Sequence, residues 1–112
     1  MKPRKPLRKV SARRAFVLKL DAKWREYVLS NDSYKCAVCG ATEPLHAHHV
    51  FSRQAYPHLR HNVRNGITLC AVDHTICHHT PKAGLLIIRG IFGDKAWQEL
   101  EQLAHQGGKG HS

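Results

Sequence analysis

Residues 34–80 read YKCAVCGATEPLHAHHVFSRQAYPHLRHNVRNGITLCAVDHTICHHT, and this stretch holds all four cysteines of the chain. Cys36 and Cys39 form a Cys-x2-Cys pair, and Gly40 after them allows the tight turn of a metal-binding knuckle. No apolar signal segment follows the basic start of the chain, so we expect a reducing compartment. There, such a pair binds metal more often than it forms a disulfide. The stretch therefore predicts a small fold built around a metal ion.

The pattern around a polar loop predicts two strands and a helix. Residues 45–51 alternate weakly between apolar and polar side chains, as in a short strand. The polar loop 52–66 ends in an Asn-Gly pair, which is a strong turn signal, and residues 67–69 predict a second strand. Residues 73–79 predict a short helix that stops before a proline. We therefore expect an α+β fold with a ββα-metal core.

Together these motifs resemble the HNH endonucleases, and above all the small free-standing HNH proteins of phages and prophages. The resemblance covers residues 34–80 and implies a treble-clef-like core with a structural Zn²⁺ and one catalytic divalent ion. The segments that carry it are Cys36-x2-Cys39, Leu45-His46-Ala47-His48-His49, Asn65-Gly66-Ile67-Thr68-Leu69-Cys70 and His74.

The resemblance implies a role for each matching residue. His49 corresponds to the general base, and Asn65 to the residue that holds the base and its loop. His48 stands in a metal-ligand position, and His74 is a ligand of the catalytic ion on the helix. His78 lies four residues after His74, on the same helical face, and resembles the further histidine ligand of colicin-type nucleases. The implied catalytic set is therefore His49, Asn65 and His74, and the implied ligands of the catalytic ion are His48, His74 and His78.

Elementary chemistry agrees with these roles. Successive side chains of a strand point to opposite faces, so His48 and His49 can serve a metal ion and a water molecule separately. An imidazole with a pKa of about 6.5 is a suitable base at neutral pH. A site with three imidazoles favours Zn²⁺, Ni²⁺, Co²⁺ or Mn²⁺ over Mg²⁺, which prefers oxygen ligands.

The structural zinc site departs from the family pattern at its second half. The family has a second Cys-x2-Cys pair there, whereas this chain has Asp73 three residues after Cys70. Cys77 lies one helical turn beyond Asp73, on the same face. The fourth ligand, after Cys36, Cys39 and Cys70, is thus either Cys77 or Asp73. We favour Cys77 because thiolate suits zinc better than carboxylate, while Asp73 would also cap the helix.

The two ends of the chain differ from this core in composition. Residues 1–14 hold seven of the 18 basic residues and no acidic residue, which predicts a disordered basic arm. Residues 15–106 would then form a single HNH nuclease domain around the core 34–80, and residues 107–112 a flexible glycine-rich tail.

Two further helices are expected on either side of the core. The first runs from about Phe16 to residues 31–33, and its apolar stripe is predicted to be Leu20, Trp24, Tyr27 and Val28. After an apolar run at 83–90 of undetermined type, a second helix starts at Asp94. This second helix is expected to pack on the first through Trp97, Leu100 and Ala104.

The charge of the chain favours a nucleic acid as the partner. The formal net charge is +10, and cationic side chains add salt-dependent affinity for phosphates. The expected DNA contacts are Arg53, Arg60 and Arg64 around the site, and Lys2, Arg4, Lys5, Arg8 and Lys9 in the arm.

The function that these features favour is metal-dependent endonuclease activity on DNA. The alternatives are a zinc-ribbon module that binds DNA without catalysis, and a nuclease directed at RNA. No run of apolar residues approaches the roughly 18 needed to span a membrane, so we expect a cytoplasmic protein. If the protein is phage-encoded, as the resemblance implies, that cytoplasm is the bacterial host cell's. The expected partners are DNA and other phage proteins that process or package DNA.

Overall fold

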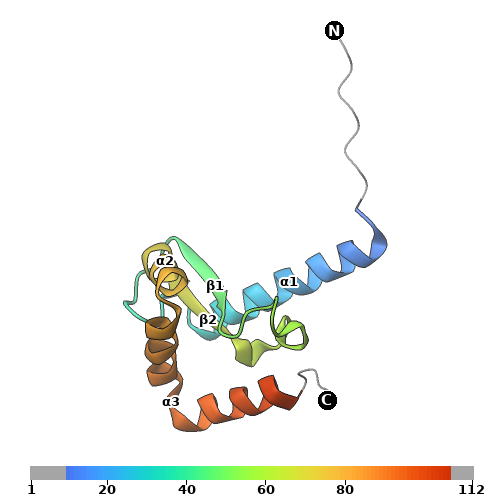
Figure 1. Cartoon of the computed structure of the whole chain (residues 1–112). Helices are drawn as coiled ribbons and strands as arrows, with labels where there is room; N and C mark the ends of the chain where they lie inside the picture. The colour runs from blue at the N-terminus through green and yellow to red at the C-terminus, as the bar shows by residue number, and fades with distance from the viewer. Residues whose placement is uncertain (1–9, 107–112) are drawn as a thin grey trace.

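The computed structural model describes residues 10–106, and this part of the chain contains three α-helices and one two-stranded sheet. Figure 1 shows their arrangement. In chain order the elements are α1 (Ala12–Asn31), β1 (Leu45–His49), the 3-10 turns η1 (Pro57–Leu59) and η2 (Val63–Asn65), β2 (Gly66–Cys70), α2 (Ala71–His79) and α3 (Pro81–Gln106). No helix in this described part is long and apolar enough to cross a membrane.

The sheet places β1 antiparallel to β2, and α2 follows β2 without a linker. In the register His48 lies opposite Ile67, and Leu45 lies opposite Cys70. The predicted α+β class and the order strand, strand, helix are therefore present. The bounds differ slightly, because β1 ends at His49 and α2 begins at Ala71, directly after Cys70 at its N-cap. Because β1 is short and α2 follows β2 directly, the end of β2 lies next to the knuckle that precedes β1.

Helix α1 begins earlier than the apolar pattern indicates. Ser11 is its N-cap, and the Ser11 side chain accepts a hydrogen bond of 3.1 Å from the backbone N–H of Arg14. Residues 12–14, expected in a disordered arm, are therefore helical, whereas residues 1–9 lie outside the described residues. The predicted stripe is correct for Trp24 and Val28, which are buried, but wrong for Tyr27, which is 52% exposed.

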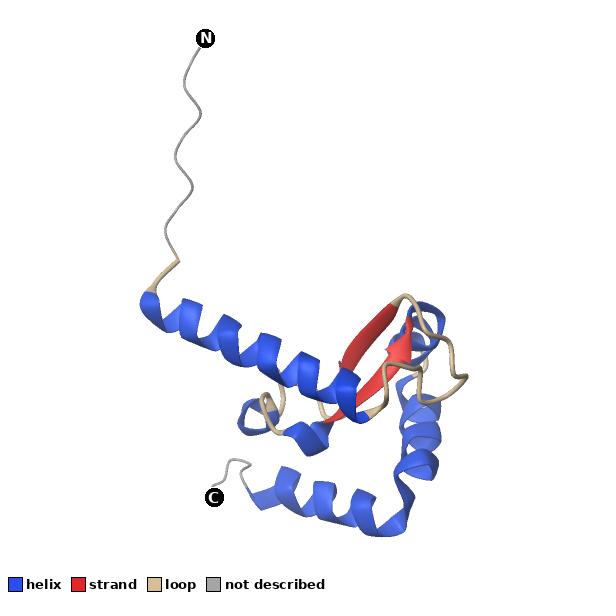
Figure 2. Cartoon of the chain, turned by 180° about the vertical axis from the view of Figure 1, so that it is seen from behind, coloured by secondary structure: helices blue, strands red, loops and turns tan. Residues whose placement is uncertain are grey.

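The long helix α3 consists of two helical segments that meet at Gly93, whose φ of 83° and ψ of 163° interrupt the helix. The second segment starts within one residue of the prediction: Asp94, expected as the N-cap, is its first helical residue after Gly93. It buries the predicted face of Trp97, Leu100 and Ala104. The undetermined run before it is helical as well. Helix α3 packs mainly against α2 and η1, where the sequence predicted packing on the first helix. Figure 2 shows α3 curving around the end of the molecule opposite α1.

Helix α1 packs closely on the first residue of β2, Gly66. A Cβ atom there would collide with the side chain of Val28 and would lie 2.9 Å from Cζ2 of Trp24. Only a residue without a side chain allows this approach, because packed interiors tolerate little added volume. The beginning of β2 is thus held against the helix that also borders the site described below.

We predict that Gly66→Ala destabilises the fold by about 1–3 kcal/mol, because α1 and β2 must separate to admit the methyl group. Gly90→Ala is the matched control, since a Cβ on that α3 residue meets no atom within 4 Å. It should be neutral or stabilise by up to about 1 kcal/mol. Urea unfolding of both variants measures the difference, and equal stability of the two would contradict the packing described here.

Candidate metal centres and catalytic cavity

A first cluster of ligand atoms joins the knuckle to the start of α2. One ligand atom from each of Cys36, Cys39, Cys70 and Asp73 lies within 4.8 Å of all the others. Gly40, with a φ of +79°, closes the knuckle, and its backbone N–H donates to the carbonyl of Cys36 at 2.8 Å. The cluster thus ties together two segments that are distant in sequence, the knuckle and the junction of β2 with α2.

The distances in this cluster suit zinc. Sγ of Cys39 and Sγ of Cys70 are 3.7 Å apart, and Oδ2 of Asp73 is 3.1 Å from Sγ of Cys36 and 3.3 Å from Sγ of Cys70. In a tetrahedral site with Zn–S bonds of about 2.3 Å, neighbouring sulfur atoms are about 3.8 Å apart. Three thiolates and one carboxylate are also a donor set that zinc accepts. The four side chains therefore fit a structural zinc ion.

The preference for Cys77 as the fourth zinc ligand is not supported, since among the described residues the thiol of Cys77 is outside this cluster. Cys77 is buried, and its Sγ packs against α3 at Gly84, where an added Cβ would lie 3.0 Å from that sulfur. Burial is the main cause that raises the pKa of the Cys77 thiol. Asp73, in the first turn of α2, faces the knuckle instead. The geometry therefore favours Asp73 over Cys77 as the fourth ligand.

A second cluster consists of the three histidines that the sequence suggested as ligands of the catalytic ion. One ring nitrogen from each of His48, His74 and His78 lies within 4.8 Å of the other two. The Nε2 atoms of His74 and His78 are 3.0 Å apart, near the spacing of about 3.4 Å expected for two nitrogen ligands held tetrahedrally about 2.1 Å from one ion. His48 reaches them from β1, because its side chain points to the face of the sheet that α2 covers.

The electrostatics of this cluster favour the neutral form of His48 and of His74. The pKa of His48 is lowered to about 4, first by burial and then by the neighbouring rings of His74 and His78. Burial also lowers the pKa of His74. A neutral imidazole has the lone pair that a metal ligand needs. The ring of His46 stacks on that of His74 with centroids 4.9 Å apart, but His46 is exposed and, like His79, lies outside the three-residue cluster.

His49 points to the other face of β1, toward α1. Its ring stacks on Trp24 with centroids 3.9 Å apart and an interplanar angle of 4°. Its Nε2 lies 3.0 Å from the carbonyl oxygen of Arg60. Because a carbonyl only accepts hydrogen bonds, Nε2 carries the proton, and in the neutral ring Nδ1 keeps its lone pair. The pKa of His49 is lowered, chiefly by burial. The structure therefore gives His49 one defined tautomer with an available basic nitrogen.

Asn65 holds the loop that presents the carbonyl of Arg60. The Asn65 side chain is fully buried. Its Oδ1 accepts from the backbone N–H of Phe51 at 2.7 Å, and its Nδ2 donates to the carbonyls of Phe51 at 2.9 Å and Leu59 at 3.3 Å. The two ends of the loop between β1 and β2 are thereby joined. All three of these hydrogen bonds are to backbone atoms, so Asn65 holds the loop that presents the carbonyl of Arg60 to His49.

Both histidine arrangements open into one cavity of about 490 Å³. Helix α1 forms one wall, with Asp21, Trp24 and Arg25, and the predicted phosphate contact Arg53 lines it as well. The sequence did not identify this wall as part of the site, because its contacts with β1 and the loop join residues about 25–40 positions apart. Its only local signal was the apolar stripe, which indicated packing for Trp24. The residues that line the cavity are Asp21, Trp24, Arg25, Ala47, His48, His49, Ser52, Arg53, Gln54, His74 and His78.

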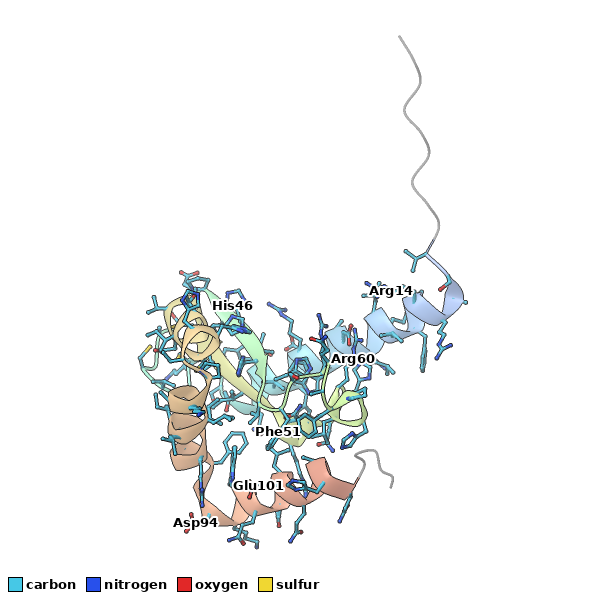
Figure 3. The ribbon with its side chains drawn as sticks, in the orientation of Figure 1. Arg14, His46, Phe51, Arg60, Asp94 and Glu101 are labelled. Atoms are coloured by element: carbon cyan, nitrogen blue, oxygen red, sulfur yellow. The ribbon has the colours of Figure 1, made fainter. Side chains whose placement is uncertain are left out.

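Two of the three arginines expected to contact phosphate are engaged elsewhere. Nε and Nη2 of Arg60 donate to both carboxylate oxygens of Asp21 at 2.9 and 2.7 Å, so this guanidinium is paired. Figure 3 shows Arg60 beside α1. Nη1 of Arg64 lies 3.8 Å from Glu99 and borders a different hollow, near Gly66. The arm residues Lys2, Arg4, Lys5, Arg8 and Lys9 lie outside the described residues.

No known protein family matches this chain, and neither a curated protein nor a solved structure matches it. The case for a function therefore depends on the geometry of the two clusters and the cavity.

We predict that Asp73→Ala lowers zinc retention, whereas Cys77→Ser does not, because only Asp73 faces the three thiolates. Cys36→Ser should lose the ion and unfold, since a structural zinc contributes binding free energy comparable to the stability of a whole small domain, about 10 kcal/mol. Zinc content by mass spectrometry after mild chelation, with circular dichroism for folding, measures both. Loss of zinc from Cys77→Ser with retention in Asp73→Ala would overturn the ligand assignment.

We also predict that Asp21→Asn destabilises the protein by about 1 kcal/mol at pH 7, a value reduced by solvent screening of the pair. The hydrogen bond from Arg60 is the main cause that lowers the pKa of Asp21 to about 2. The pair is therefore fully ionised at neutral pH, and its contribution is lost only as the pH falls from about 4 to 2. Glu99→Gln is the control, because its 3.8 Å pair with Arg64 is more exposed and should contribute less than about 0.5 kcal/mol. Urea unfolding compares the two.

Proposed function

We propose that this protein is a metal-dependent endonuclease that hydrolyses DNA phosphodiester bonds, with β1, β2 and α2 forming an HNH-type ββα-metal core. The observation that carries the proposal is that one cavity contains both a cluster of three imidazoles and a separate imidazole in a defined tautomer. A base and a cation site on opposite sides of one phosphate are what metal-assisted phosphodiester hydrolysis requires.

In this proposal His49 is the general base. Its Nε2–H is bonded to the carbonyl of Arg60, so Nδ1 can take a proton from a water molecule in the cavity. The stacked ring of Trp24 restricts rotation of the imidazole out of this orientation. As the ring becomes an imidazolium, the existing hydrogen bond from Nε2–H to the carbonyl of Arg60 becomes charge-assisted and stabilises the positive charge.

His48, His74 and His78 would hold a divalent ion that neutralises the charge developing on the phosphoryl and leaving-group oxygens. Three neutral nitrogen donors favour Zn²⁺, Ni²⁺, Co²⁺ or Mn²⁺ over Mg²⁺. His74 would act in catalysis through this ligation.

The remaining walls of the cavity suit a phosphodiester. Arg25 and Arg53 line it from α1 and from the loop after β1. Neither has a carboxylate partner among the ion pairs of residues 10–106, so both guanidinium groups can contact phosphate oxygens. Asn65 would be a positioning residue, because its hydrogen bonds hold the loop that orients His49.

A zinc module that binds DNA without catalysis is the second candidate, and the cluster of three cysteines with Asp73 by itself favours it. Such a module has no use for a histidine trio beside an oriented imidazole. Nuclease activity on RNA is the third candidate, since the cavity suits a phosphodiester of either kind. Activity measurements on plasmid and on RNA separate the three.

We predict that the wild-type protein nicks supercoiled plasmid in the presence of Mn²⁺ or Ni²⁺, and that His49→Ala reduces the rate about 100- to 10,000-fold, the usual effect of losing a positioned base. DNA binding should persist, because the substitution leaves the cationic side chains in place. His79→Ala is the matched control, since this exposed α2 histidine lies outside both clusters, and it should nick at the wild-type rate.

Two results would contradict the proposal. Near-normal nicking by His49→Ala would remove the base assignment, and DNA binding by the wild type with no nicking under any divalent ion would favour the zinc module. Faster cleavage of RNA than of DNA would favour the third candidate.

A further inference from the structure

The first turns of α1 extend beyond the body of the protein. Every residue from Ala12 to Phe16 is exposed, and the first buried residue of the helix is Trp24. Figures 1 and 2 show this half of the helix projecting away from the sheet. Phe16 is 62% exposed on it, and short helices without tertiary contacts are only marginally stable in water. A projecting helix of this kind suits contact with a partner.

One face of α1 continues the wall of the catalytic cavity. Arg14, Leu18, Asp21 and Arg25 are spaced by four, three and four residues, so they lie along one side of the helix; we name these four residues the α1 stripe. Asp21 and Arg25 line the cavity, whereas Arg14 lies near the far end of the helix (Figure 3). The α1 stripe therefore runs from the cavity outward along the projecting helix.

The net charge of the α1 stripe is positive. Its only acidic residue, Asp21, already accepts both hydrogen bonds of the Arg60 guanidinium and a contact of 2.7 Å from His61. Arg14 and Arg25 have no carboxylate partner among the ion pairs of residues 10–106. Two unpaired guanidinium groups therefore follow the stripe, and Arg53 continues them into the cavity.

We infer that the α1 stripe binds the phosphate backbone of double-stranded DNA on one side of the bond that is cut. The inference rests on the proposed function for the position of that bond, but the DNA binding itself does not depend on cleavage. Arg14 and Arg25 are 11 residues apart, which is about 16 Å along a helix and about five base pairs of duplex. A helix fits the major groove of B-form DNA, about 12 Å wide, but not the narrow major groove of A-form RNA.

The same helix offers a matched control for the charge itself. Lys19 and Lys23 are exposed, and at about 100° per residue they lie roughly opposite the α1 stripe. The double variants Arg14→Gln with Arg25→Gln, and Lys19→Gln with Lys23→Gln, remove the same charge from the same helix. Any difference between them reports on which face contacts DNA.

The first experiment measures binding of the full chain to a labelled 20-base-pair DNA duplex by fluorescence anisotropy over a series of salt concentrations. The Arg14→Gln, Arg25→Gln variant should bind about 10-fold more weakly at 0.1 M salt, and its log–log salt slope should be smaller by about 1.8, the value for two lost phosphate contacts. The Lys19→Gln, Lys23→Gln variant should keep the wild-type slope. Thermal melting of both variants verifies that the fold is unchanged.

The second experiment separates this inference from the proposed function. Arg14→Gln alone, remote from the cavity, should reduce plasmid nicking at low protein concentration but leave hydrolysis of bis(4-nitrophenyl) phosphate unchanged, since that small diester cannot reach Arg14. If the wild type cleaves neither substrate, the proposed function fails, and the binding comparison still decides the inference.

Several outcomes would overturn the inference. Equal losses of affinity in the two double variants would mean that the charge of α1 acts without a preferred face. Wild-type binding in both would show that α1 does not contact DNA. Tighter binding of the wild type to a duplex RNA of the same length would assign the projecting helix to RNA instead.

Discussion

The buried amide of Asn65 closes the loop between β1 and β2, and the geometry of the cavity depends on that closure. A fully buried side-chain amide is costly unless its hydrogen bonds are made, and Asn65 makes them with the backbone of Phe51 and Leu59. The closed loop places Leu59 in the core and the carbonyl of Arg60 against His49. Asn65 would therefore not take part in the proposed proton transfer itself, but the loop that it closes orients His49, the proposed base.

The alternation of side chains along β1 gives the cavity two sides, each with its own histidine. His48 faces α2 and joins two helical histidines, whereas His49 faces α1 and stacks on Trp24. Two adjacent residues can thus serve a cation and a water molecule without competing. Helix α1 lies outside the stretch that contains the cysteines. Because His49 faces α1, this helix nevertheless forms one wall of the cavity.

Helix α2 connects the two clusters of ligands. Asp73 faces the three thiolates, and the next residue, His74, faces His48 and His78. A zinc ion held by the first cluster would anchor the first turn of α2 to the knuckle, and this would fix the helix that carries the second cluster. A zinc ion in the first cluster would therefore couple it to the proposed catalytic site through α2.

Much of this arrangement follows from local sequence pattern. The two strands, the short helix and the placement of His74 and His78 on one helical face depend on side-chain alternation and on a spacing of four residues, which are properties of the chain itself. The resemblance to HNH endonucleases implied that His48 joins them, and the packing of β1 on α2 brings it there. The rest depends on packing between distant segments. Asp73, and not Cys77, lies with the three thiolates, while Cys77 packs against α3 at Gly84. Arg60 is paired because α1 brings Asp21 to it across 39 positions, and Tyr27 is exposed because β2 meets α1 at Trp24 and Val28 instead. Periodicity specifies which residues share a face, but only the tertiary structure determines what that face meets.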